Sequence, residues 1–243
     1  MSKVLLVTGA ARGIGAAIAL RAAEDGFAVG VNYRDNSDRA AMVVRHIRER
    51  GGRACAVQAD TSREDDVVRM FRATQEELGP LDAFVNNAGI VGEPGPVMDT
   101  SSAKLHEVFD VNVIGYFLCA REAVRSMQGR KGAIVNVSSR LSVLGGAGEQ
   151  VHYAATKAAI DALTVGLSGE VAPLGIRVNC VRPGIIATEI HANRPAEVLK
   201  NAEKVIPLRR IGTADEVAEA VVWLLSDHAS YITGAMLDVG GGR

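Results

Sequence analysis

A tyrosine and a lysine stand four residues apart in the segment Tyr153-Ala-Ala-Thr-Lys157. At a spacing near the helical period, both side chains lie on one face of a helix and become neighbours. The ordinary pKa of tyrosine is about 10, and a nearby ammonium lowers it because it stabilises the phenolate. The pair therefore indicates a tyrosine that acts as a general acid or base, the alternative being two side chains that simply face water.

Three glycines, Gly9, Gly13 and Gly15, follow a short apolar run near the N-terminus, in the segment TGAARGIG. Their spacing differs from the commoner G-x-G-x-x-G pattern. The physical requirement is the same, because a tight turn must let the backbone approach a pyrophosphate and a helix must present its free N–H groups. The glycines predict a dinucleotide site, and a merely tight turn is the alternative.

Short apolar runs alternate with helical patterns along the chain. The alternation predicts an α/β fold, a doubly wound, Rossmann-like parallel sheet of about seven strands with helices on both faces. We expect residues 1–243 to form a single domain, with 185–210 as an insertion on the substrate side. The expected strands are 4–7, 27–33, 54–59, 82–87, 132–139, 176–181 and 235–239, and the helical patterns include 14–26, 38–52, 62–80 and 151–172.

The composition is that of an ordinary globular enzyme, with a formal net charge of −1 and 48% hydrophobic residues. The near-zero charge gives no reason to expect a nucleic acid or an acidic membrane surface as a partner. Three scattered cysteines and scattered histidines offer no metal-ligand spacing, so we expect no metal and buried, apolar cysteines. The first apolar run is too short for a signal peptide or a membrane span, which favours a cytoplasmic protein.

Several segments together resemble the short-chain dehydrogenase/reductase family. They are the glycine segment at 8–15, NNAG at 86–89, Asn112 in DVNVIG, Ser139 before Tyr-x-x-x-Lys, RPGIIAT at 182–188 and ITG at 232–234. They occur in the family's order over essentially the whole chain.

The resemblance implies hydride transfer between a nicotinamide dinucleotide and a carbonyl or alcohol, with Tyr153 as the general acid or base. Ser139 would hydrogen-bond the substrate oxygen, although Ser138 is a rival for that role. Lys157 would also bind the nicotinamide ribose. Asn112 would hold a water that passes protons to Lys157, the alternative being a helix asparagine that bonds its own backbone.

The resemblance also predicts the residues that bind the dinucleotide. Asp60 would contact the adenine, although a turn residue before the third helix would look the same. Thr188 would bond the carboxamide or a phosphate. The full predicted set is Gly9, Arg12, Gly13, Ile14, Gly15, Tyr33, Arg34, Asp60, Asn87, Ala88, Gly89, Tyr153, Lys157, Pro183, Gly184, Ile186 and Thr188.

The residue after the second strand separates NADP from NAD. An NAD site usually has an acid here, whereas this strand ends in Tyr33 followed by Arg34. Arg12 and Arg34 could fork around a 2′-phosphate, so we predict NADP(H). Asp35 complicates this prediction because it could turn toward the ribose, although it fits better as the start of the next turn.

Three segments, 90–97, 141–152 and 185–210, should contact the substrate. Their polar residues make the lining mixed and favour a polar carbonyl or alcohol; these are Glu149, His152, Glu189, His191, Asn193 and Arg194. The chain resembles both glucose 1-dehydrogenase-like and 3-oxoacyl-carrier-protein reductase branches. A carrier protein would need a basic rim, for which Arg125, Arg130 and Lys131 are candidates.

Two other functions stay open at this point. The chain could be a catalytically silent NADP-binding sensor, or an NAD-dependent sugar or alcohol dehydrogenase, because a fold does not establish a function. The small residues of 151–172 and the apolar C-terminal segment fit the homotetramer of the family, and ordinary core packing is the alternative.

Overall fold

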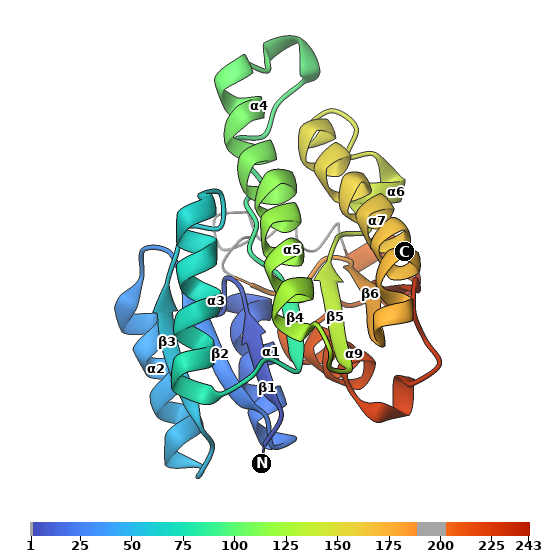
Figure 1. The fold of residues 1–243 in the computed structure, drawn as a ribbon. Helices are drawn as coiled ribbons and strands as arrows, with labels where there is room; N and C mark the ends of the chain where they lie inside the picture. The colour runs from blue at the N-terminus through green and yellow to red at the C-terminus, as the bar shows by residue number, and fades with distance from the viewer. Residues whose placement is uncertain (1, 189–202) are drawn as a thin grey trace.

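The computed structural model describes residues 2–188 and 203–243, and one parallel sheet runs through them (Figure 1). The sheet has seven strands in the order β3-β2-β1-β4-β5-β6-β7. Their bounds are β1 Val4–Val7, β2 Ala28–Tyr33, β3 Ala54–Gln58, β4 Ala83–Asn86, β5 Gly132–Val137, β6 Ile176–Pro183 and β7 Met236–Val239. Every neighbouring pair is parallel, which confirms the predicted doubly wound sheet.

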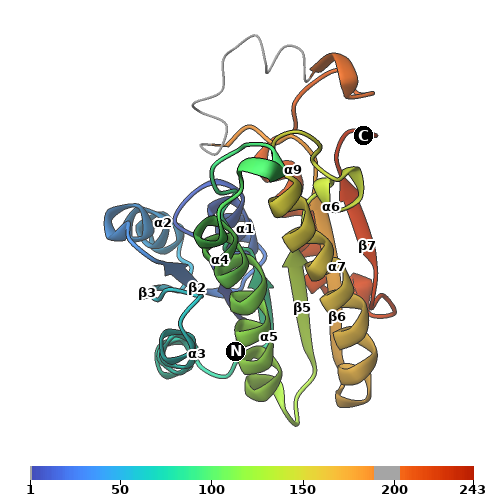
Figure 2. The same ribbon diagram turned by 90° about the horizontal axis from the view of Figure 1, so that it is seen from above.

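Helices cover both faces of the sheet, as Figure 2 shows from above. One face packs on α1 (Gly13–Glu24), α2 (Ser37–Glu49) and α9 (Ala214–Leu225), and the other on α3 (Glu64–Leu78), α5 (Gly115–Met127) and α7 (Val151–Val171). Alternate strand residues supply the two cores, since Leu5 and Val7 face the first layer while Val4 and Leu6 face the second.

The strand order reverses between β1 and β4, and this reversal creates the place for a ligand. The chain winds outward from β1 to β3, then returns to the other side of β1 and winds outward again to β7. The loops that leave β1 and β4 therefore run in opposite directions and leave a crevice beyond the carboxyl ends of these strands.

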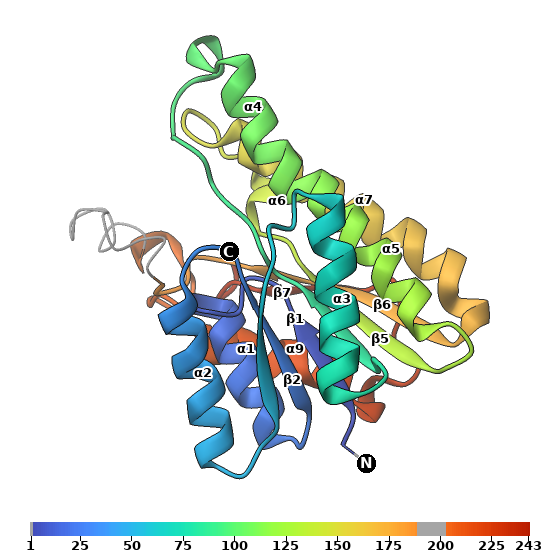
Figure 3. The same cartoon turned by 60° about the vertical axis from the view of Figure 1, so that its left-hand side comes forward.

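A rod of three helical segments precedes β5, and the predicted pattern did not include it. It consists of α4 (Ser102–Phe109), a π-helical turn (Asp110–Ile114) and α5, and α4 extends beyond the sheet (Figure 3). At Gly115 the rod passes so close to the loop before α3 that a Cβ would lie 2.8 Å from the Thr61 carbonyl oxygen. The π-turn contains Asn112 and widens the helix there, a distortion that often marks functional sites.

The expected strands are all present, with small changes at their ends. The fifth strand ends at Val137 instead of 139, because Ser138 and Ser139 leave the ladder at the carboxyl edge. The segment after it contains a short helix, α6 (Leu141–Leu144), where a plain loop was expected. Of the predicted insertion 185–210, residues 189–202 lie outside the described residues. Within 2–188 and 203–243, no helix is long and apolar enough to cross a membrane.

Candidate active site

A cavity of about 930 Å³ lies at the carboxyl edge of the sheet. Its volume is at the upper end of the range for ligand pockets. Every residue that the sequence assigned to dinucleotide binding lines it, from the glycine loop to Thr188, and Ser139 lines it as well. Asn112 does not belong to the lining.

The glycine loop fits a pyrophosphate because its backbone is tightly folded and open to the cavity. Gly9 and Gly13 have φ angles of +63° and +55°, which favour glycine. A Cβ on Gly15 would lie 2.4 Å from the Gly9 carbonyl oxygen and 2.6 Å from Nδ2 of Asn87. Helix α1 begins at Gly13 with no acid in its first turn, so its N-terminal N–H groups can receive an anion.

Two buried polar side chains hold the glycine loop in place, and the sequence analysis missed both. The Thr8 hydroxyl accepts hydrogen bonds from the backbone N–H groups of Asn87 (2.8 Å) and Ala88 (3.0 Å). Asn32 accepts from the Gly9 N–H at 3.0 Å and donates to the Ala59 carbonyl at 3.2 Å. The signal for Asn32 was its presence in the otherwise apolar strand VGVNY, where a buried amide needs partners.

The glycine loop, the end of β2 and the start of α2 place several charged side chains in the cavity lining. Arg12, Arg34 and Arg39 all line it, and Arg39 was not predicted. Asp35 also lines it and accepts a 2.6 Å hydrogen bond from Nε of Arg34, so it is more than a turn residue. Asn36, not Asp35, caps α2.

Asp60 is a turn residue that also lines the cavity, and its contact with the adenine remains a prediction. It lines the cavity, and its carboxylate accepts hydrogen bonds from the backbone N–H and the hydroxyl of Ser62 at 2.9 and 2.7 Å. The carboxylate therefore shapes the turn before α3 while it stands beside the adenine end of the predicted dinucleotide site.

The two serines after β5, Ser138 and Ser139, have different partners, and this difference distinguishes the two candidates for the hydrogen bond to the substrate oxygen. Ser138 is buried, and its hydroxyl donates to the Lys157 carbonyl oxygen at 2.9 Å, which ties α7 to β5. Ser139 is partly exposed, its hydroxyl accepts from the Leu141 N–H at 3.1 Å, and it lines the cavity together with Tyr153. The geometry thus favours Ser139 as the serine that meets a substrate oxygen.

The Lys157 side chain is buried, and its ammonium is held by two acceptors. Nζ donates to the Val137 carbonyl oxygen at 2.8 Å and to the Tyr116 hydroxyl at 3.3 Å. It lies 5.7 Å from the ring centre of Tyr153. A Cβ on Gly89 would lie 3.5 Å from Nζ, so this glycine leaves the approach to the ammonium open.

The predicted lowering of the Tyr153 pKa is wrong for the free protein. Burial raises the pKa of Tyr153 to about 12, and the hydrogen bond with Ser139 offsets only part of this effect. The Lys157 ammonium faces the ring of Tyr153 and bonds other groups, so it does not compensate for the loss of solvation. The two residues are neighbours, as the spacing predicted, but the expected effect on the pKa does not follow.

Asn112 is fully buried in the π-turn and bonds the backbone of Ile90 from both ends of its amide. Oδ1 accepts from the Ile90 N–H at 2.9 Å, and Nδ2 donates to the Ile90 carbonyl at 2.7 Å and to the Thr156 hydroxyl at 3.1 Å. Its partner is thus the backbone beyond NNAG instead of its own helix. The predicted water relay to Lys157 remains a prediction.

The comparisons with known proteins agree with this geometry. A family model described as enoyl-(acyl carrier protein) reductase matches residues 9–243. The chain is 52% identical to the oxidoreductase YgfF of Escherichia coli (strain K12) over 99% of each chain. The chain belongs to the short-chain dehydrogenase/reductase family.

Two further proteins are similar to this short-chain dehydrogenase/reductase over nearly its whole length. The 3-oxoacyl-[acyl-carrier-protein] reductase FabG of Staphylococcus aureus (strain Mu50) is 40% identical over 100% of this chain and 98% of its own. A crystal structure of a short-chain dehydrogenase from Burkholderia cenocepacia in complex with NADP has a TM-score of 0.92 and 34% identity, over 99% of this chain and 97% of that one.

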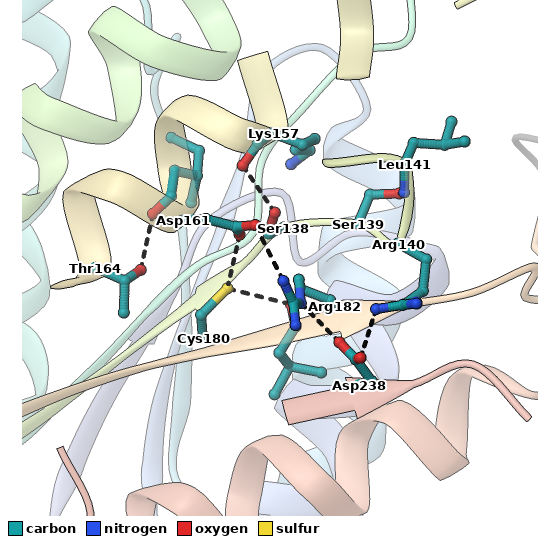
Figure 4. Close-up of polar contacts among 12 residues, drawn as sticks. Ser138, Ser139, Arg140, Leu141, Lys157, Asp161, Thr164, Cys180, Arg182 and Asp238 are labelled. Carbon is teal, nitrogen blue, oxygen red and sulfur yellow. Dashed lines mark hydrogen bonds and ion pairs between the residues drawn. The ribbon is translucent and has the colours of Figure 1, made fainter. Parts of the chain in front are cut away.

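A charged network lies behind the two serines of this dehydrogenase/reductase (Figure 4). Arg182 bridges Asp161 of α7 at 3.5 Å and Asp238 of β7 at 2.6 Å. Asp238 also accepts from Arg140, the residue after Ser139. Cys180 contacts the Asp161 carboxylate through its buried thiol. The network joins β6, β7 and α7 to the Ser139 turn, and the sequence revealed only Arg182 of its members.

Of the candidates for substrate contact, two lie within the described residues, and only one of them lines the cavity. His152 is buried, and its Nε2 donates to the Val91 carbonyl at 3.0 Å, so it fixes the 90–97 segment and does not line the cavity. Glu149 does line it. The remaining candidates, Glu189, His191, Asn193 and Arg194, lie outside the described residues.

The proposed basic rim is not beside the cavity. Arg125 lies in the last turn of α5, and Arg130 and Lys131 lie between α5 and the start of β5, at the amino edge of the sheet. Arg125 pairs with Glu122 and Arg130 with Asp82, each at 2.8 Å. The prediction of a basic rim is therefore wrong, because these residues lie at the amino end of β5 and the cavity lies at the carboxyl edge of the sheet.

The buried ammonium should cost stability. Burial lowers the pKa of Lys157 from 10.5 to about 8, so the unfolded chain holds this proton more tightly than the folded one. The cost is fully present below pH 8 and is relieved as the pH rises toward 10.5. We expect Lys157→Met to raise the free energy of unfolding at pH 7 by on the order of 2 kcal/mol, with a smaller gain at pH 10.

Urea unfolding at the two pH values measures this effect. Lys131→Met, which removes an exposed lysine, is the control and should leave stability nearly unchanged at both. A Lys157→Met protein that is less stable than the wild type at pH 7 would contradict the claim that burial of the Lys157 ammonium lowers the free energy of unfolding.

Proposed function

We propose that the chain is an NADP(H)-dependent oxidoreductase that transfers hydride to or from a small carbonyl or alcohol substrate, with Tyr153 as the general acid or base. One observation carries the proposal. Ser139, Tyr153 and Lys157 line the same cavity that the glycine loop opens into.

The residues of this chain divide the work among them. NADPH, when bound, supplies hydride to the carbonyl carbon. The Ser139 hydroxyl donates a hydrogen bond to the substrate oxygen, which gains negative charge, and Tyr153 donates its proton to that oxygen. The Lys157 ammonium keeps one N–H beyond its bonds to Val137 and Tyr116 and can use it on a ribose hydroxyl. In the oxidising direction Tyr153 accepts the proton.

Removal of the Tyr153 hydroxyl tests this assignment. We expect Tyr153→Phe to lower kcat by about 10²–10⁴-fold, because the general acid is lost, and to leave the Kd for NADPH within about threefold. The measurement is NADPH absorbance with a panel of aldehydes, ketones and sugars. Tyr231→Phe, which changes a fully exposed tyrosine, is the matched control and should keep full activity.

Two outcomes would contradict the proposal in different ways. Full turnover by Tyr153→Phe would remove this residue from the chemistry. A wild-type protein that binds NADPH but turns over no member of the panel would support the silent sensor instead.

The lining beyond Ser139 supports a small substrate. Apolar side chains of Val91, Leu141 and Leu144 stand there with the carboxylate of Glu149, so the described lining combines apolar contact with charge. The arginines at the amino edge of the sheet give no support to a carrier protein at the cavity mouth.

Three arginines support NADP(H) over NAD(H). Arg12, Arg34 and Arg39 line the cavity at the end where a 2′-phosphate would lie, and guanidinium groups suit a phosphate geometrically. The rival reading rests on Asp35, which lines the same end and could accept from a ribose hydroxyl, as acids do in NAD sites. Its hydrogen bond from Arg34 Nε leaves the Nη groups of that arginine for the phosphate.

The effect of Arg34→Ala measures this preference. We expect the KM for NADPH to rise by about tenfold and the KM for NADH to change by less than about twofold, because one charge-assisted contact to the phosphate is lost. Arg45→Ala, on the exposed face of α2 outside the cavity, controls for the general positive charge of this helix. An unchanged ratio of the two KM values would exclude Arg34 as a residue that sets the preference for NADPH over NADH.

The exposed apolar side chains support a homotetramer. On one face, Ile114 at the end of the π-turn and Phe117 at the start of α5 are half exposed, as is Val165 on α7. At the far side of the sheet, Trp223 of α9 and Leu237 of β7 are exposed. Two such surfaces can each bury against a second copy, which gives four chains. Light scattering of the purified chain tests this, and a monomer at micromolar concentration would contradict it.

A further inference from the structure

We propose that Tyr116 is a positioning residue for Lys157, holding its ammonium charged and aimed at the cavity. The proposal rests on the proposed function, and it concerns a tyrosine that no motif singled out. Tyr116 stands at the start of α5, directly after the π-turn.

Tyr116 is held in place at its side-chain hydroxyl and at its backbone carbonyl. It is almost completely buried, with 1% exposure. Its hydroxyl donates to the Val137 carbonyl oxygen at 2.9 Å, and its own carbonyl oxygen accepts from Nδ2 of Asn86 at 3.0 Å. The residue therefore spans the carboxyl ends of β4 and β5 and has little freedom to move.

The Tyr116 hydroxyl has one lone pair directed at the lysine. Nζ of Lys157 donates to it at 3.3 Å, and the same ammonium lies 5.0 Å from the ring centre of Tyr116. The hydrogen bond and the contact with the aromatic face both favour a charged ammonium. Burial holds the pKa of Tyr116 well above its ordinary value, so its hydroxyl keeps its proton and remains a neutral acceptor.

The ammonium needs this support because little else offsets its burial. Burial lowers the pKa of Lys157 to about 8, near the working pH. The titratable groups that face it are Tyr153 and Asp161 on α7, Cys180 on β6 and Tyr116 on α5. Asp161 favours the charged lysine, but its carboxylate is already paired with Arg182.

The position of Tyr116 also explains where the lysine points. Val137 O and Tyr116 Oη hold the ammonium from the side of the sheet and of α5. The direction that remains leads to Gly89, whose missing side chain opens the way to the cavity. Without the hydroxyl, one acceptor is lost and the ammonium is free to turn about the single bond to Val137.

The test is the pKa of Lys157 in the wild type and in Tyr116→Phe, measured by NMR from the 13Cε signal of labelled lysine and assigned with Lys157→Met. The ring is kept, so the fold should be kept. We expect the pKa to fall by about 0.5–1 unit, because one hydrogen bond to the charged form is lost.

The pH profile of kcat separates this role from a structural one. A pKa lowered by about 0.7 unit predicts a loss of about 1.5-fold at pH 7 and about fivefold at pH 9, because less lysine is charged at the higher pH. A merely structural defect would lower kcat equally at both pH values. Thr164→Val, which removes another buried hydroxyl of this region, is the control and should leave the Lys157 pKa unchanged.

An unchanged Lys157 pKa in folded Tyr116→Phe would overturn the proposal. If that variant does not fold, the wild type still decides, because the 13Cζ signal of Tyr116 should move with the titration of Lys157, and independent titrations would overturn it. The NMR titration does not depend on turnover, so a wild type that reduces no carbonyl would count against the proposed function and not against Tyr116.

Discussion

The burial of one ammonium beside the end of β5 is the constraint on which the site depends. Lys157 is buried, and the Val137 carbonyl and the Tyr116 hydroxyl accept hydrogen bonds from its ammonium in place of water. Burial acts on its neighbour in the opposite sense, lowering the pKa of Lys157 to about 8 and raising that of Tyr153 to about 12. Both side chains therefore favour their neutral forms more than they would in water.

This arrangement changes the simple picture of a lysine that makes its neighbour acidic. In the free protein burial keeps Tyr153 protonated, and the Lys157 ammonium uses two of its N–H groups on the Val137 carbonyl and the Tyr116 hydroxyl. A protonated tyrosine is the form that a reductase needs before it donates its proton. The additional positive charge of an oxidised nicotinamide would then favour the phenolate, so the acidity of Tyr153 would depend on what is bound.

The fold supplies the rigidity that such a site requires. Val137 ends a central strand, Ser138 ties that strand to α7, and the network around Arg182 secures the turn that carries Ser139. On the other side, Thr8 and Asn32 fix the glycine loop against the ends of β4 and β2. The reacting groups, which come from the end of β5 and from α7, thus keep their mutual geometry, which hydride and proton transfer both need.

Much of this could be predicted from the sequence, because local patterns determine it. Apolar runs in strands and glycines in tight turns are properties of short segments, so the sheet was predicted correctly and the residues predicted to bind the dinucleotide all line the cavity. Tyr116, Thr8 and Asn32 were missed because their roles come from partners far along the chain, such as Val137 and Asn87. The pKa of Tyr153 was predicted in the wrong direction because spacing shows which side chains are neighbours, whereas burial depends on the whole fold.

The most direct measurement is the ionisation of Tyr153 itself. Ultraviolet difference titration of the wild type against Tyr153→Phe isolates its phenolate signal, in the protein alone and with saturating NADP⁺. We predict a pKa near 12 for the protein alone. With NADP⁺ the pKa should fall by about 1–3 units, because a positive charge then lies near the hydroxyl. A Tyr153 that ionises near neutral pH in the protein alone, or whose pKa does not respond to NADP⁺, would contradict this account.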